Sequence, residues 1–167
     1  MNKQSILLNV KFWVLAVGTS LLASCGLNSP ENVFDPIEQF EKETEAIDAY
    51  LEANDIEAEV DSVSLIRYVM VEQGSGEMPE DTDDINIDYE GKFLANDQVF
   101  DSGENKTFTL SGLIPAWRLM MPQVKEGGTI IFYAQSYYCY GNTNLGSIPA
   151  NSTLIFEITL NSIKANN

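Results

Sequence analysis

Leu113-Ile114-Pro115-Ala116-Trp117 is the stretch of sequence on which the fold depends. Two aliphatic residues lead into a proline, which suits the first turn of a helix because the N–H group that proline lacks would be unpaired there. We therefore expect a short helix over residues 115–121, ended by Pro122. Trp117 then lies one turn into the helix on the side of Ile114, and a backbone N–H at the helix entrance has no partner. The stretch predicts one tight apolar corner.

The sequence on both sides of this helix has the two-residue period of strands with one buried face. It is clearest in 85–93, where isoleucine, tyrosine and phenylalanine alternate with polar residues, so Tyr89 is expected to point inward. Asn96-Asp97 indicates a tight turn after this strand, and a polar loop is expected around Gly103. The expected strands are 63–71, 85–93, 99–101, 107–110, 130–134 and 154–160.

A loop over residues 136–152 separates the last two strands and carries three tyrosines and Ile148. Loops of this length are usually functional or disordered, and the aromatic residues argue against disorder. The short helix can bury itself only against the sheet, so an antiparallel sheet with one such helix is an α+β domain. We place this domain at residues 62–167.

A second helix is expected in front of this domain, in an N-terminal extension over residues 35–61. Asp35-Pro36 is typical of a helix start, and Asn54 of a helix end. Residues spaced by three and four form one mainly apolar stripe: Ile37, Phe40, Thr44, Ile47 and Leu51. The stripe either packs on the domain or forms a dimer seam. Its length of about two heptads favours packing, so we expect a monomer or a weak dimer through this helix.

Residues 1–24 have the pattern of an export signal, with Lys3 and Lys11 ahead of an apolar run that is short for a transmembrane helix. The run ends in Leu22-Ala23-Ser24-Cys25, which resembles the bacterial lipobox. The resemblance implies a lipidated Cys25, a tether over residues 25–34 and an anchor in the membrane of the cell envelope, with the outer membrane of a Gram-negative bacterium favoured. The alternative is an ordinary signal peptide with a chance cysteine.

The composition excludes several kinds of function. A net charge of −16 repels phosphate groups, so nucleic-acid binding is not expected. The chain has no histidine, which excludes His-based catalysis and most transition-metal sites. The acidic group 80–84 lacks EF-hand spacing and is interpreted as a solvated loop. Cys139 is expected to be structural, because no histidine can activate it. We expect no cofactor and no metal ion.

From about Ser62 to Lys164 the sequence resembles the FK506-binding-protein (FKBP) type of peptidyl-prolyl cis–trans isomerase. Each marker is weak alone, but the set follows the order and nearly the spacing of the family. The markers are Tyr89-Glu90-Gly91, Val99-Phe100-Asp101-Ser102, Phe108-Thr109-Leu110, Leu113-Ile114-Pro115-Ala116-Trp117, Gly127-Gly128, Tyr138-Cys139-Tyr140-Gly141, Ile148-Pro149 and Thr153-Leu154-Ile155-Phe156. The family fold is a twisted antiparallel sheet wrapped around one short α-helix, in agreement with the strand and helix pattern.

The resemblance implies a substrate pocket lined by aromatic side chains. Trp117 would form its floor beneath a proline ring. Its walls would be Tyr89, Phe100 and Phe156.

The resemblance also assigns the polar and remaining groups of this pocket. The backbone N–H of Ile114 and the hydroxyl of Tyr140 would donate hydrogen bonds to substrate carbonyls, and Asp101 would hold a polar edge. The remaining substrate-binding positions would be Leu113, Ile148 and Phe108.

Prolyl isomerisation by such a pocket needs no acid, base or nucleophile, because the barrier comes from amide resonance. A dry pocket can favour the twisted amide. The resemblance implies an isomerase that assists the folding of exported or envelope proteins, with proline-containing polypeptides as substrates and FK506- or rapamycin-type macrolides as ligands. The alternative is a catalytically weak or silent lipoprotein of the same fold, acting as a chaperone or surface adaptor. Ala116 and Ser147, which depart from the usual family residues, favour it.

Overall fold

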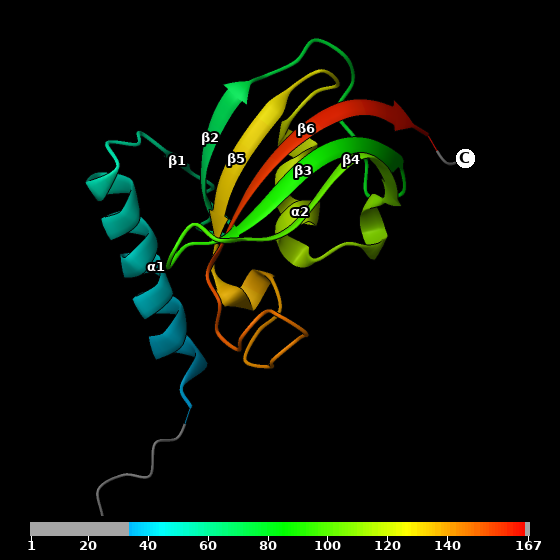
Figure 1. The fold of residues 1–167 in the computed structure, drawn as a ribbon. Coiled ribbons are helices and arrows are strands. Elements are labelled where there is room, and N and C mark those ends of the chain that lie inside the picture. Colours follow the sequence, from blue (N-terminus) through cyan, green and yellow to red (C-terminus); the bar gives the residue numbers. More distant parts are fainter. Residues whose placement is uncertain (1–33, 166–167) are drawn as a thin grey trace, which may run out of the picture. The chain divides into compact units, whose positions relative to one another are not determined.

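The computed structural model describes residues 34–165; the predicted signal, Cys25 and residues 26–33 of the predicted tether lie outside them. Its sheet has six strands, with every pair antiparallel, in the order β1-β2-β5-β6-β3-β4 (Figure 1). The strands are β1 (Glu59–Val60), β2 (Arg67–Glu72), β3 (Asp84–Phe93), β4 (Val99–Thr109), β5 (Thr129–Ala134) and β6 (Leu154–Lys164). The helices are α1 (Pro36–Ala53), α2 (Pro115–Met120) and the 3₁₀ turns η1 (Leu110–Gly112), η2 (Met121–Gln123) and η3 (Ser136–Tyr138). The expected α+β class is confirmed.

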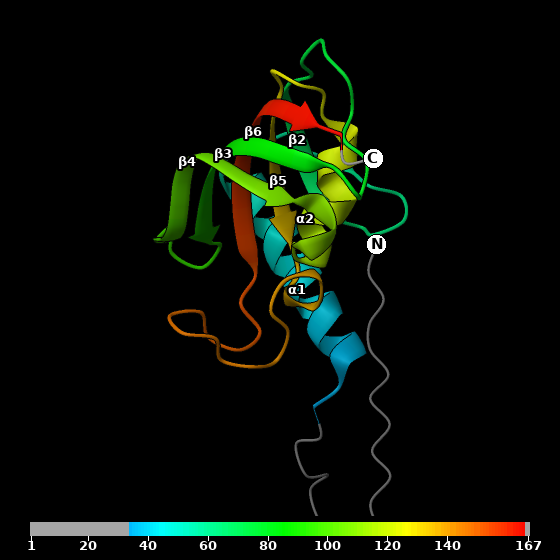
Figure 2. The same ribbon diagram turned by 90° about the vertical axis from the view of Figure 1, so that its right-hand side faces the viewer.

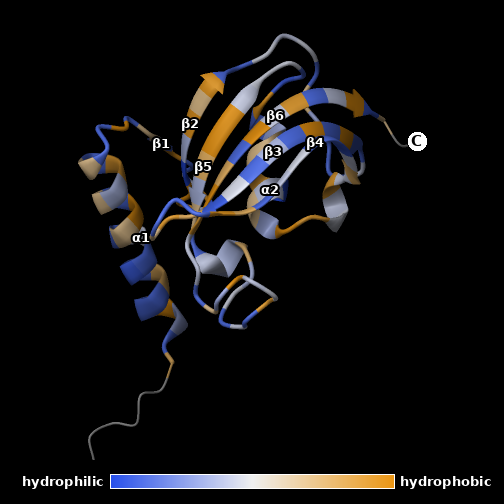
Figure 3. Ribbon diagram, in the orientation of Figure 1, coloured by the Kyte–Doolittle hydropathy of each residue, from blue (hydrophilic) through white to orange (hydrophobic). Residues whose placement is uncertain are grey.

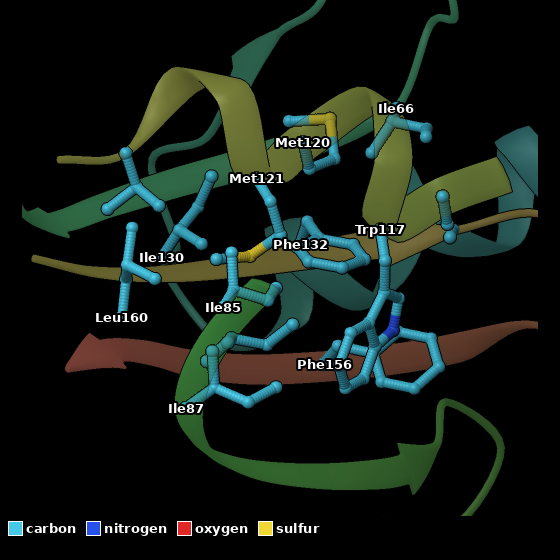
Figure 4. Packing of buried hydrophobic residues seen from close by; sticks show 14 of the residues in the cluster. Ile66, Ile85, Ile87, Trp117, Met120, Met121, Ile130, Phe132, Phe156 and Leu160 are labelled. Carbon is cyan, nitrogen blue, oxygen red and sulfur yellow. The ribbon is translucent and has the colours of Figure 1, made fainter. Parts of the chain in front are cut away.

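One face of the sheet packs against α2, and the main hydrophobic core lies between them (Figures 2 and 4). The alternation predicted for β3 is present, since Ile85 and Ile87 are fully buried between half-buried polar neighbours. The same alternation in β6 buries four residues to 2 % exposure or less: Leu154, Phe156, Ile158 and Leu160. The two-residue period of the sequence therefore sets which side chains face α2.

The opposite face of the sheet carries α1. The Asp35 carboxylate accepts hydrogen bonds from the backbone N–H groups of Ile37 and Glu38, at 2.8 and 3.3 Å, as expected for a helix N-cap. Ile47 and Leu51 are buried against residues of the sheet and its loops: Leu94, Tyr133 and Ile155. Of the two alternatives for the helix stripe, packing on the domain is the one found. Within residues 34–165, no helix combines the length and the apolar character needed to span a membrane.

β5 is covered on both faces. Figure 3 shows hydrophobic residues along most of its length, whereas hydrophobic and hydrophilic residues alternate along β6 and β3. Phe132 belongs to the core beneath α2, and the next residue, Tyr133, belongs to the cluster beneath α1. A strand buried on both sides reads as a nearly continuous apolar run, which is why the pattern of β5 is less clean than that of β3.

Three of the expected strands have wrong boundaries, and the last of them, β6, continues to Lys164 where an end at residue 160 was expected. β2 begins at Arg67 rather than at residue 63, because the Asp61 carboxylate accepts from the backbone N–H groups of Val63 and Ser64 and holds a turn there. β4 runs unbroken from 99 to 109, where a polar loop around Gly103 was expected. Gly103 pairs with Tyr89 of β3, and the register shifts nearby, so irregular pairing takes the place of the loop.

Candidate active site

The local sequence around α2 places Trp117 against the sheet. Ile114 is the extended residue before the helix and its carbonyl accepts from the Trp117 N–H at 3.0 Å, with Pro115 in the first turn as predicted. Trp117 is 6 % exposed and the preceding Ala116 is fully buried. The indole Nε1 has no acceptor among the described residues, an unpaired buried donor of the kind found at functional sites.

Three aromatic rings surround the Trp117 indole. The ring centroids lie 5.3 Å away for Tyr89, 5.5 Å for Phe156 and 6.5 Å for Phe108, all edge-on. Figure 4 shows the indole directly beside the Phe156 ring over β6. Such edge-to-face pairs contribute about 0.5–1.5 kcal/mol each beyond area burial, so the cluster holds Trp117 in one orientation.

Phe100 extends the ring cluster from β4. Its ring lies 5.9 Å from Phe156 and 5.1 Å from Phe93. Gly91 lies between Asp101 and Phe156 in the sheet, and a Cβ at this position would lie 2.6 Å from Phe100 Cζ. The missing side chain of Gly91 therefore makes the space that the Phe100 ring occupies.

Polar groups lie at the edge of the ring cluster. The Tyr89 hydroxyl donates to Asp101 Oδ2 at 2.9 Å. Burial first, then the hydrogen bond and negative charge of Asp101, raise the pKa of Tyr89 to about 12. Burial also raises the pKa of Tyr140, whose hydroxyl has no hydrogen-bond partner among residues 34–165. The Ile114 N–H is likewise without a partner in the described part of the chain, so two donors are available to a ligand.

An alkaline titration should reveal the Tyr89–Asp101 pair. Because the Tyr89 pKa is raised from 10.0 to about 12, its neutral hydroxyl contributes stability that is complete below pH 10 and is lost as the pH rises from 10 to about 12. Tyr89→Phe should flatten the fall in unfolding free energy over this window, measured by urea denaturation. Tyr50, whose pKa is also raised to about 12, retains part of the slope. An unchanged slope in Tyr89→Phe would contradict the assignment.

The structure brings most of the predicted site residues together. Leu113, Ile114 and Tyr140 are half-buried and pack against the core that contains Trp117. Ile148 is buried at 7 % exposure within its own loop, outside that cluster, where it pairs with Leu145. Cys25 lies outside the described residues, so its lipidation stays a prediction.

Three contributors to this site had no role assigned from the sequence, although Gly91 belongs to the marker Tyr89-Glu90-Gly91. Phe93 supports Phe100, and Phe132 lies 5.3 Å from Phe156 beneath the cluster. Gly91 lies in the interior of β3, and glycine inside a strand is a signal of close approach that would have identified it. The two phenylalanines have the pattern of ordinary core residues, so periodicity could not single them out.

Cavities lie beside the rings. One of about 470 Å³ is lined by Phe93, Ser147 and Pro149 among others, and another of about 390 Å³ is lined by Tyr89 and Gly103 among others. Trp117 lines neither, so an open space above the indole stays a prediction.

The cysteine and the acidic residues offer no other reactive centre in the described part of the chain. Burial raises the pKa of the Cys139 thiol, which keeps it protonated. No group of three or more metal-ligating side chains occurs within residues 34–165.

Comparison with known proteins gives a family match and several similar relatives. The family model described as FKBP-type peptidyl-prolyl cis-trans isomerase matches residues 75–161. FkpA, an FKBP-type peptidyl-prolyl cis-trans isomerase of Escherichia coli K12, is 35 % identical over 100 residues, which are 58 % of this chain and 37 % of FkpA. The peptidyl-prolyl cis-trans isomerase Mip of Coxiella burnetii is 33 % identical over 104 residues, 59 % of this chain and 45 % of Mip. These matches span less than half the length of either relative.

Solved structures have the same fold. The crystal structure of FkpA from Escherichia coli is 28 % identical, with a TM-score of 0.66 over 77 % of this chain and 62 % of that chain. A peptidyl-prolyl cis-trans isomerase from Pseudomonas syringae pv. tomato has a TM-score of 0.65 at 17 % identity, over 81 % of this chain and all of that one. At that identity, the second similarity concerns the fold alone.

Proposed function

The chain belongs to the FKBP-type peptidyl-prolyl cis-trans isomerase family, and from this premise we propose that it catalyses cis–trans isomerisation of X–Pro bonds in polypeptides. The observation that carries the proposal is the set of rings around Trp117, with the centroids of Tyr89 and Phe156 within 5.5 Å and that of Phe108 at 6.5 Å. A proline ring would lie against this set, and the two unpartnered donors, on Ile114 and Tyr140, would orient the flanking carbonyls.

The chemistry would follow from exclusion of water. An X–Pro bond isomerises in tens to hundreds of seconds without catalysis, because rotation breaks amide resonance. Water strengthens that resonance through hydrogen bonds to the carbonyl oxygen, and an aromatic surface removes them. The hydroxyl of Tyr140 would bind a neighbouring carbonyl and hold the chain while the amide twists. Tighter binding of the twisted amide than of either planar form would lower the barrier.

We further propose an envelope role. The pattern of residues 1–24 and the lipobox-like stretch ending in Cys25 support export and lipid anchoring, with the outer membrane favoured. Exported proteins that contain proline would be the substrates. Macrolides of the FK506 or rapamycin type would compete for the same rings. A weak dimer would need a surface other than the buried half of the α1 stripe, because Ile47 and Leu51 pack on the sheet.

A peptide assay tests the proposal. The protein beginning at residue 34 should accelerate cis–trans exchange in a short proline-containing peptide, observed by NMR exchange spectroscopy. An FK506-type macrolide should inhibit it. No acceleration at micromolar protein would contradict the proposed activity, and binding of unfolded chains without acceleration would favour the silent chaperone.

Tyr140→Phe should lower kcat/KM by between about 2-fold and 10-fold. This is the range expected for removing one hydrogen bond of net worth about 0.5–1.5 kcal/mol while the ring remains. The same peptide assay measures it. Tyr137→Phe is the matched control, because Tyr137 is 70 % exposed on the same loop. Equal activities of Tyr140→Phe and wild type would remove the hydroxyl from the proposal.

A further inference from the structure

Glu43 is a buried carboxylate for which the proposed chemistry has no use. It lies in the middle of α1 and is 4 % exposed. Its Oε2 accepts from the Ser136 backbone N–H at 2.6 Å, and its Oε1 accepts from the Ser136 hydroxyl at 2.7 Å and from Gln39 Nε2 at 2.6 Å. Burying a carboxylate is costly unless hydrogen bonds compensate it, and charged hydrogen bonds of this kind are the stronger ones.

Ser136 begins η3, the first turn of the loop that carries Tyr140. The Ser136 carbonyl accepts from the N–H groups of Cys139 at 2.9 Å and Gly141 at 2.8 Å, the two residues that flank Tyr140. The Gly141 carbonyl in turn accepts from the Asn151 N–H at 2.8 Å. Glu43 therefore binds Ser136, and the Ser136 carbonyl holds the backbone on both sides of Tyr140 through hydrogen bonds.

Other side chains of α1 contact the same part of the loop. The Phe40 ring lies edge-on to Tyr137 and Tyr138, at centroid distances of 6.3 and 6.1 Å. The Thr44 hydroxyl accepts from Gln135 Nε2 at 2.9 Å. One face of α1 therefore contacts the first residues of the loop, and Glu43 lies in the middle of that face.

We propose that Glu43 is a positioning residue for the isomerase site, acting through Ser136 on Tyr140. This inference rests on the proposed function, because only that function assigns substrate binding to the Tyr140 hydroxyl. The N-terminal extension then does more than cover the sheet: one of its side chains sets the place of a substrate-binding hydroxyl on a loop more than 90 positions away in sequence. Misplacement of a binding group by about 1 Å can cost up to about 100-fold in rate.

A double-mutant cycle tests the proposal. In the peptide assay, Glu43→Ala should lower kcat/KM about as much as Tyr140→Phe does. In the Tyr140→Phe background, Glu43→Ala should cause less than about a further twofold loss, because coupled residues are not additive. Glu41→Ala, on an exposed position of the same helix, is the control and should leave kcat/KM unchanged. Glu43→Gln keeps one acceptor oxygen, so its kcat/KM should lie between those of wild type and Glu43→Ala. If Glu43→Ala does not fold, Glu43→Gln replaces it in the cycle.

Amide hydrogen exchange gives a second readout. The N–H groups of Cys139 and Gly141 should exchange faster in Glu43→Gln than in wild type or Glu41→Ala. If the Glu43 substitution lowers kcat/KM equally with Tyr140 and with Tyr140→Phe, the inference is overturned. The loss would then come from a general effect on stability. An active wild type with an unimpaired Glu43→Gln and unchanged exchange would overturn it as well, without touching the proposed function. An inactive wild-type protein would instead overturn the proposed function, and this inference with it.

Discussion

Trp117→Ala is expected to lose most of the isomerase activity, with a fall in kcat/KM of at least about tenfold. The substitution removes three edge-on ring contacts, each worth about 0.5–1.5 kcal/mol, together with the surface on which the proline ring would rest. Because the indole is buried, the same change should lower the free energy of unfolding by about 3–5 kcal/mol. Peptide exchange and urea denaturation measure the two effects.

Trp117→Phe is the conservative partner of this substitution. It keeps an aromatic ring against Tyr89 and Phe156, so it should lose less of both quantities than Trp117→Ala. A folded Trp117→Ala protein with activity within about twofold of wild type would show that the indole is not the surface on which the amide twists.

Removal of α1 is expected to have the second large effect. A protein beginning at residue 62 should be about 3–6 kcal/mol less stable than one beginning at residue 34, because full burial of Ile47 and Leu51 contributes about 1.5–3 kcal/mol each. The truncation also breaks the hydrogen bond from the Tyr50 hydroxyl to Asp97, at 2.7 Å, and the ion pair between Arg67 and Asp48, at 2.8 Å. It removes β1 and the Asp61 carboxylate as well, so the measured difference includes their loss. Urea denaturation of both proteins measures the difference.

Single substitutions check that packing of α1 is the cause. In the protein beginning at residue 34, Ile47→Ala should cost about 2–5 kcal/mol. Glu45→Ala, at an exposed position two residues earlier, should stay within about 0.5 kcal/mol of wild type. Equal urea midpoints for the two chain lengths would mean that residues 62–167, the boundaries expected from the sequence, fold independently of the helix.

Patterns that are local in the sequence predicted the parts of this structure that are locally determined. Pro115 and the residues around it predicted α2, which ends one residue before the expected position. The alternation in 85–93 predicted which face of β3 is buried, and with it the inward position of Tyr89. In these cases a steric constraint or a two-residue period acts within a few residues of where it is read.

What the sequence could not predict depends on partners that are distant along the chain. β4 continues through a polar segment because β3 pairs with it and accommodates irregular register. Glu43 has the pattern of a solvated residue on an acidic helix, and only the approach of Ser136 gives it buried donors. The ring of Phe132 joins the site through Phe156 on the paired strand β6, which lies far along the chain. Amino-acid composition and hydrophobic periodicity carry no information about such long-range contacts.

The double coverage of β5 has a consequence for how faithfully the sheet assembles. Because Phe132 and Tyr133 serve different cores, sliding the strand by one position would exchange them, putting the wrong ring beneath each helix. A one-residue shift of β5 would disrupt packing on both faces of the sheet, whereas the same shift in a strand with one solvent-exposed face disrupts packing on one face only. Both layers therefore depend on a single alignment of β5 with its neighbours.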